Sequence, residues 1–171
     1  MKINKTVFLA IVIITTMSCD NKVSLSLPSI FSDQMILQRE TEVSFWGKSS
    51  PKENIKITGS WGSSSSTIAD NSGKWQLKLS TPSAGGPYEV VVNDSKNSII
   101  YKDVLIGEVW LASGQSNMQW KLNQCKNCID NQDDEIENAN YNQIRFFNNP
   151  MDLSGTIINS QKWKNVNPKD A

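Results

Sequence analysis

Short segments in which apolar and polar residues alternate strictly make up the first half of this 171-residue chain, and they constrain its fold more than any other feature. A period of two places apolar side chains on one face of a strand and polar ones on the other. With turn signals between the segments and no helical pattern, this alternation predicts a small antiparallel β-sandwich, jelly-roll-like, over residues 19–101. The apolar positions are Val43 and Phe45, then Ile55 and Ile57, then Trp75, Leu77 and Leu79.

The turn signals are runs of Gly, Pro, Ser, Asn and Asp at residues 47–51, 59–66, 70–73 and 82–87. Within the second run, the four serines at 63–66 predict the tip of a hairpin. Residues 88–92, which follow the last run, predict another strand.

The pattern changes after Ile99. Residues 103–112 form a more continuous apolar run, which is typical of a strand covered on both faces in a parallel sheet. Residues 122–140 contain helix-compatible stretches, and residues 144–147 predict the next strand. Residues 102–171 are therefore expected to be the incomplete start of an α/β domain, and the chain the N-terminal part of a longer protein.

The N-terminus has the pattern of a secretory signal peptide over residues 1–18. Two lysines precede an apolar stretch at residues 7–14, which is too short to span a bilayer, and the small residue Ser18 closes the segment. The mature protein is therefore expected to be exported, to the periplasm or the cell surface.

Cys19 directly after Ser18 resembles the lipobox of bacterial lipoproteins, in which this cysteine is acylated. Thr16 and Met17 depart from the usual lipobox residues, so cleavage without lipidation is the alternative. Acylation of Cys19 would anchor the chain to a membrane without spanning it.

The two other cysteines, Cys125 and Cys128, form an even pair in an oxidising compartment. We expect either a local disulfide or two free thiols. A zinc site needs two further ligands, and with Cys19 acylated the chain has no histidine and no other cysteine to supply them. The equal numbers of basic and acidic residues, 17 of each, leave no basic stripe for nucleic acid.

Residues 107–118 read Gly-Glu-Val-Trp-Leu-Ala-Ser-Gly-Gln-Ser-Asn-Met, a predicted strand followed by a tight turn with Ser116 at its tip. A serine hydroxyl is a poor nucleophile at neutral pH and needs a general base, usually imidazole. Because the chain contains no histidine, such a base has to come from outside these 171 residues.

Five segments together resemble the N-terminal half of a bacterial sialate O-acetylesterase: residues 27–39, 46–47, 73–75, 85–88 and 103–118. The resemblance implies a jelly-roll-like β domain combined with an SGNH-type, flavodoxin-like hydrolase domain. It also implies removal of O-acetyl groups from sialic acids or other acetylated sugars through an acyl-enzyme. No metal or organic cofactor is implied.

Carried over by this resemblance, Ser116 is the nucleophile, and its backbone N–H contributes to the oxyanion hole. Gly114 allows the sharp turn, and Gln115 and Asn117 are weaker candidates for positioning the turn or the substrate. The family's histidine and aspartate lie far downstream of the matched segments, so a chain that lacks them is expected to be inactive alone. The acidic residues at 130–137 are expected to form a solvated face rather than a base or a metal site.

The alternative function is a non-catalytic surface lipoprotein that binds a glycan or another partner. It rests on Trp46, Trp61 and Trp75, since aromatic faces stack on sugar rings, although buried tryptophans are common in small β-sandwiches. A decayed fragment with an uncovered apolar strand is a third possibility.

Overall fold

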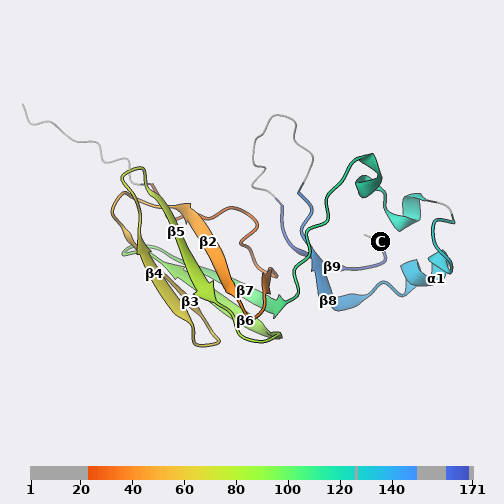
Figure 1. The fold of residues 1–171 in the computed structure, drawn as a ribbon, viewed down its shortest axis with the longest axis horizontal. Helices are drawn as coiled ribbons and strands as arrows, with labels where there is room; N and C mark the ends of the chain where they lie inside the picture. The colour runs from red at the N-terminus through yellow and green to blue at the C-terminus, as the bar shows by residue number, and fades with distance from the viewer. Residues whose placement is uncertain (1–22, 126, 150–160, 170–171) are drawn as a thin grey trace, which may run out of the picture.

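The computed structural model describes residues 23–125, 127–149 and 161–169, so the predicted signal peptide and Cys19 lie outside the described residues. Seven strands form the first part of the described chain, and we call them together the N-terminal sheets (Figure 1). They are β1 (Ile36–Gln38), β2 (Glu42–Lys48), β3 (Asn54–Gly59), β4 (Ser64–Ile68), β5 (Lys74–Ser80), β6 (Gly85–Asn93) and β7 (Ser98–Gly107).

The N-terminal sheets comprise a five-stranded sheet in the order β1-β7-β6-β3-β4 and a two-stranded sheet of β2 and β5. β1 pairs with β7 in parallel, and the other pairs in both sheets are antiparallel. The alternation predicted for β2, β3 and β5 is confirmed, and β5 alternates between exposed and buried side chains along its whole length.

One hydrophobic core lies between the two sheets, which face one another as layers (Figure 1). Phe45 of β2 is fully buried at its centre, and the ring of Phe31 stacks on it with ring centroids 4.7 Å apart. The alternating apolar positions of the sequence supply this core because every second side chain of a strand points to the same face. Its other fully buried members include Met35, Ile55, Ile57, Leu79, Val90, Val92 and Val104.

The serine run does not form a hairpin tip as predicted. Residues 64–68 form strand β4, which pairs with β3 at the edge of the five-stranded sheet. The tip lies earlier, where the Gly59 N–H donates to the Ser63 carbonyl at 2.9 Å and Gly62 adopts a φ of +99°. An edge strand tolerates this polar composition because one face and one edge are open to water.

The predicted turn at residues 82–87 is also shorter than expected, since β6 already begins at Gly85. In contrast, the strand predicted at residues 88–92 is confirmed within β6.

Beyond the N-terminal sheets, the structure contains two short 3-10 turns, Ser116–Gln119 (η1) and Leu122–Gln124 (η2), and helix α1 (Gln132–Glu137). Strands β8 (Tyr141–Phe146) and β9 (Lys164–Val166) follow and pair antiparallel with each other. Figure 1 shows the chain leaving β7 and running away from the N-terminal sheets toward these turns and α1. The strand predicted at residues 144–147 corresponds to β8, which begins earlier, at Tyr141, and ends at Phe146. The described residues do not confirm a parallel α/β unit.

The single strand predicted over residues 103–112 ends at Gly107. Trp110 and Leu111, which were expected inside a covered sheet, are 87% and 95% exposed. The physical reason is that β7 belongs to the five-stranded sheet, and no strand of the described chain pairs with the residues that follow it. The predicted domain boundary at Tyr101 falls within β7, so the five-stranded sheet extends past it; the division into two domains stays a prediction.

Arg145 of β8 joins the β8–β9 hairpin to the N-terminal sheets. Its side chain is 4% exposed, and its guanidinium donates to the backbone carbonyls of Gln34 and Asp103 and, at 2.9 Å, to the Asp103 carboxylate. Trp163 adds a second link, because its indole N–H donates to the Ile30 carbonyl at 2.8 Å. These contacts fix where the hairpin sits.

Candidate active site

The segment that carries Ser116 is attached to the N-terminal sheets at the point where β1 and β7 end side by side. Gln38, the last residue of β1, pairs with Gly107, the last residue of β7. The Gln38 side chain accepts a hydrogen bond from the Val109 backbone N–H at 2.8 Å and donates one to the Glu108 carboxylate at 2.9 Å. The first two residues after β7 are therefore held by one side chain.

Arg39 strengthens this attachment. Its Nε donates to the other Glu108 carboxylate oxygen at 2.7 Å, and its backbone N–H donates to the Gly107 carbonyl at 2.9 Å. The hydroxyl of the buried residue Thr81 donates a hydrogen bond of 2.7 Å to the Gln38 backbone carbonyl. We call residues 108–118 the serine segment, and Gln38, Arg39 and Glu108, which hold its beginning, the anchor.

Hydrogen bonds from Gln38 and from Arg39 lower the pKa of the Glu108 carboxyl from its ordinary value of 4.5. A carboxyl whose pKa is lowered on folding stabilises the folded state fully above its ordinary pKa, and that contribution is lost as the pH falls through the lower, folded pKa. The anchor is therefore complete at neutral pH and weakens only in acid below pH 4.5.

An NMR pH titration of the Glu108 side chain is expected to give a pKa below 4.5. The Val109 amide signal should shift over the same pH range, because both groups bond to Gln38. Gln38→Ala should return the Glu108 pKa toward 4.5, whereas Gln143→Ala, an exposed glutamine on β8, should leave it unchanged. A Glu108 pKa that is the same with and without the Gln38 side chain would contradict this account of the anchor.

After the anchor the segment is exposed up to Ser116, where the first 3-10 turn begins. The Met118 N–H donates to the Gln115 carbonyl at 2.9 Å and closes this turn around the serine. A Cβ atom added to Gly114 would lie 2.5 Å from Met118 Cγ, so a larger residue at this position would force the Met118 side chain to move. The role of Gly114 in shaping the turn stays a prediction.

Ser116 is exposed at the start of η1, and its nucleophilic role stays a prediction. Gln115 is also exposed, while the side chain of Asn117 lies outside the described residues. The four predicted residues, Gly114 to Asn117, are consecutive and lie in or directly before this turn, and the first three of them are exposed. The structure tests no assignment of a base, since the chain has no histidine.

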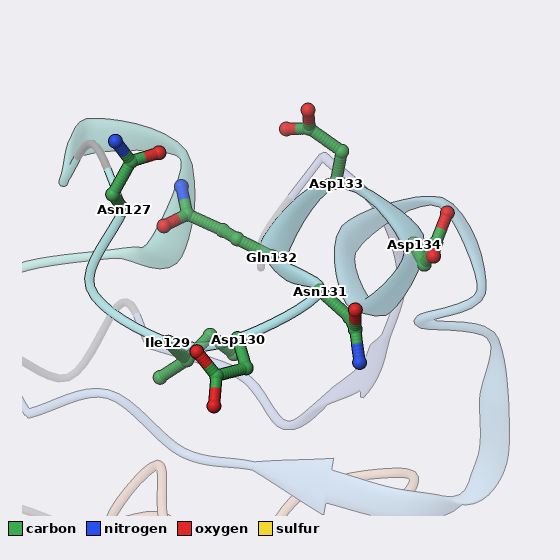
Figure 2. Close-up of a pocket in the computed structure, with 7 residues that line it drawn as sticks. All are labelled: Asn127, Ile129, Asp130, Asn131, Gln132, Asp133 and Asp134. Atoms are coloured by element: carbon green, nitrogen blue, oxygen red, sulfur yellow. The ribbon is translucent and has the colours of Figure 1, made fainter.

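The acidic residues near α1 border a hollow of about 580 Å³ (Figure 2). Figure 2 shows the carboxylates of Asp130 and Asp133 pointing to opposite sides of the loop. Over the part of the chain that the structure describes, no three carboxylate, cysteine or histidine groups come together in a way that would hold a metal ion. The acidic side chains of residues 130–137 are exposed, as expected for a solvated face.

Cys125 and Cys128 are joined as a disulfide, with their Cα atoms 5.8 Å apart. Gln132, at the start of α1, fastens the same loop: its amide donates to the carbonyls of Leu122 and Cys125 at 2.8 and 2.6 Å and accepts from the Cys128 N–H at 2.9 Å. The cysteine pair thus closes a local loop beside α1.

The three tryptophans singled out in the sequence have different environments. Trp75 is 4% exposed in the core, and Trp61 packs edge-on against Tyr88 and donates to the Ser80 carbonyl. Trp46 is 43% exposed, and the ring of Phe31 supports it edge-on at 4.8 Å. Of these three, Trp46 is the one that offers an open aromatic surface.

Sequence reasoning assigned no role to the anchor or to Arg145. Gln38 and Arg39 belong to the segment that carries the family resemblance, and their position at the end of a short apolar run is the one signal that the sequence offers. Their partner Glu108 is 70 residues away from Gln38, so only the pairing of β1 with β7 brings the two together.

None of the helices in the described ranges is long and apolar enough to cross a membrane.

The fold resembles that of a carbohydrate acetylesterase. The crystal structure of such an enzyme from Xanthomonas citri matches with a TM-score of 0.76 and 33% sequence identity, over 86% of this chain and 34% of that one. No known protein-family profile matches the chain.

Relatives in sequence are sialate O-acetylesterases. The one from Homo sapiens is 32% identical over 128 residues, which is 68% of this chain and 24% of that protein. The one from Mus musculus is 28% identical over 149 residues, which is 81% of this chain and 27% of that protein. The predicted resemblance to the sialate O-acetylesterase family is therefore confirmed, and the chain spans about a quarter of the length of these relatives.

Proposed function

We propose that this chain is part of a serine carbohydrate esterase that removes O-acetyl groups from sialic acids or other acetylated sugars. The carrying observation is the serine segment, which matches the family in sequence and lies in an exposed turn fastened to the N-terminal sheets. In this proposal the N-terminal sheets are the β-sandwich domain of the esterase, and residues 102–171 are the first part of its SGNH-type α/β domain.

Ser116 Oγ attacks the carbonyl carbon of the acetyl ester while a general base takes the hydroxyl proton. The ester C–O bond then breaks, the sugar oxygen receives the proton, and the acetyl group remains bonded to Ser116 Oγ. Water hydrolyses this acyl-enzyme to free acetate and regenerates the serine. The backbone N–H of Ser116, at the first position of the turn, supports the oxyanion because such N–H groups have no partner within the turn.

The base is proposed to be a histidine outside these 171 residues, since this chain has none. The test compares the 171-residue chain with a longer polypeptide that contains it together with such a histidine, using acetate release from an O-acetylated sialic acid. We expect turnover by the longer polypeptide and none by the chain alone. Failure of the longer polypeptide to release acetate from acetylated sialic acid and from other acetylated sugars would refute the proposal.

Export and lipid anchoring are part of the same proposal. The basic and apolar N-terminus followed by Cys19 supports a lipoprotein at the periplasmic or cell-surface side of a bacterial membrane. Detergent phase partitioning of the expressed protein should place it in the detergent phase, and Cys19→Ala should move it to the aqueous phase. Equal partitioning of the two would argue for cleavage without lipidation.

A further inference from the structure

The outer face of the β2–β5 sheet carries an aromatic group next to two positive charges. Trp46 lies directly opposite Gln76, and Lys48 lies directly opposite Lys74 in the antiparallel register. All four side chains are exposed. Residues two positions apart on a strand share a face and are separated by about 7 Å, so the indole and the two ammonium groups are within reach of one small ligand.

These residues line a cleft of about 790 Å³, one wall of which is the segment that contains Ser26, Leu27 and Pro28, beside β2. That wall is fixed by paired backbone hydrogen bonds of 2.9 Å between Ser26 and Lys48. A Cβ atom at Gly47 would clash with the Ser26 carbonyl and with the Trp75 ring, so glycine is required where wall and floor meet. The cleft is thus bounded by strands β2 and β5 and by the segment at Ser26 that is hydrogen-bonded to β2.

The charges in the cleft favour an anion. Like charges placed directly opposite each other on neighbouring strands repel, and the described residues contain no ion pair to either Lys48 or Lys74. Asp70 also lines the cleft, but its Oδ1 accepts three hydrogen bonds, from the Ser72 N–H and hydroxyl and from the Lys74 N–H. The charge of Lys74 also acts on the Asp70 carboxyl and contributes to lowering its pKa, but two lysines against one carboxylate leave a net positive charge.

One further group, the indole of Trp46, is suited to a sugar. Trp46 presents an open face that the Phe31 ring holds in place, and indole faces stack on the apolar faces of pyranose rings.

We propose that this cleft binds an acidic sugar, with Trp46 against the ring and Lys48 and Lys74 paired with the carboxylate. The choice of an acidic sugar over other anions rests on the proposed function, because sialic acids carry a carboxylate on a pyranose ring. The cleft lies on the N-terminal sheets, whereas Ser116 lies beyond β7, so it is a second carbohydrate site that holds a sialylated glycan apart from the acetyl group being removed.

The test is a calorimetric titration of the 171-residue chain with N-acetylneuraminic acid, which carries no O-acetyl group and requires no turnover. Trp46→Ala, and separately the double variant Lys48→Gln with Lys74→Gln, should each raise the Kd by about tenfold or more. The matched control is Lys56→Gln with Lys102→Gln, two exposed lysines on β3 and β7, which should leave the Kd unchanged. Thermal melts of all variants verify that each one folds.

Three further ligands decide the chemistry of the site. The methyl ester of N-acetylneuraminic acid should bind more weakly if the lysines pair with the carboxylate, and glucose should bind more weakly still. Inorganic phosphate that binds as well as the sugar, with no dependence on Trp46, would reduce the site to general attraction of anions and overturn the proposal. Absence of sugar binding at millimolar concentration would also overturn it.

Failure of this inference and failure of the proposed function have different signatures. Ser116→Ala should leave N-acetylneuraminic acid binding intact, since Ser116 does not line the cleft. If the longer polypeptide hydrolyses acetyl esters and none of the cleft variants affects sugar binding, the proposed sugar site is wrong and the proposed esterase activity stands. If sugar binding depends on Trp46 but the longer polypeptide has no esterase activity, the sugar site stands and the proposed esterase activity is wrong.

Discussion

Ser116→Ala is expected to lower kcat/KM for acetate release by about 10⁴- to 10⁶-fold in the longer, histidine-containing polypeptide, because the nucleophile of a serine hydrolase contributes on this scale. The substitution removes one oxygen atom from an exposed turn and leaves the backbone N–H in place. The expected result is therefore loss of kcat with folding unchanged. Acetate release measured over a range of concentrations of an O-acetylated sialic acid gives both kcat and KM.

Ser113→Ala is the matched control for this prediction. Ser113 is also exposed, lies three residues earlier on the same segment, and has no assigned role. It should retain activity within about threefold, which corresponds to less than 1 kcal/mol. Covalent labelling by a fluorophosphonate should follow the same pattern, with label on Ser116 and none after its replacement. Full activity of Ser116→Ala would refute the assignment of the nucleophile.

Phe45→Ala is expected to reduce the free energy of unfolding by about 3–5 kcal/mol, the usual cost of removing a large aromatic side chain from a core. Phe45 is fully buried between the two sheets, and Phe31, which stacks on it, also supports Trp46. Since small domains are stable by only about 5–15 kcal/mol, this variant loses a large part of its stability. Urea denaturation followed by tryptophan fluorescence measures the change.

Ile68→Ala provides the comparison for the core variant. Ile68 is also a large apolar residue on a strand, but it is 68% exposed at the edge strand β4. Its replacement should change the free energy of unfolding by no more than about 0.5 kcal/mol. Equal destabilisation by the two substitutions would mean that the core does not lie between the sheets as described.

The N-terminal sheets have two proposed roles, which are to hold the serine segment through the anchor and to bind a sugar in the cleft. Gln38 and Arg39 fasten the beginning of the serine segment to one end of the five-stranded sheet. Trp46, Lys48 and Lys74 occupy the outer face of the other sheet. A rigid scaffold with functional groups on its connections and faces is the usual way in which β domains support a site.

The candidate site was predictable only in part. The serine and its turn followed from the run of residues 107–118 and from a family resemblance that the comparisons confirm. The exposed environment of Trp110 and Leu111 did not, because their apolar character predicted a covered strand and the described chain supplies no neighbour to cover them. The sequence also did not show that Trp46 is exposed and Trp75 buried, because this difference depends on how β2 and β5 pair and on which face of their sheet covers the core.

The sequence by itself determined which segments become strands in β2, β3 and β5, since the pleat repeats every two residues and the apolar alternation follows that repeat. Only the tertiary structure decided which distant residues the ends of the strands contact. Glu108 reaches Gln38 across 70 residues, and Arg145 reaches Asp103 across 42, because the sheet order and the docking of the β8–β9 hairpin bring them together. Local periodicity holds no information about such partners, so the anchor of the serine segment became visible only in three dimensions.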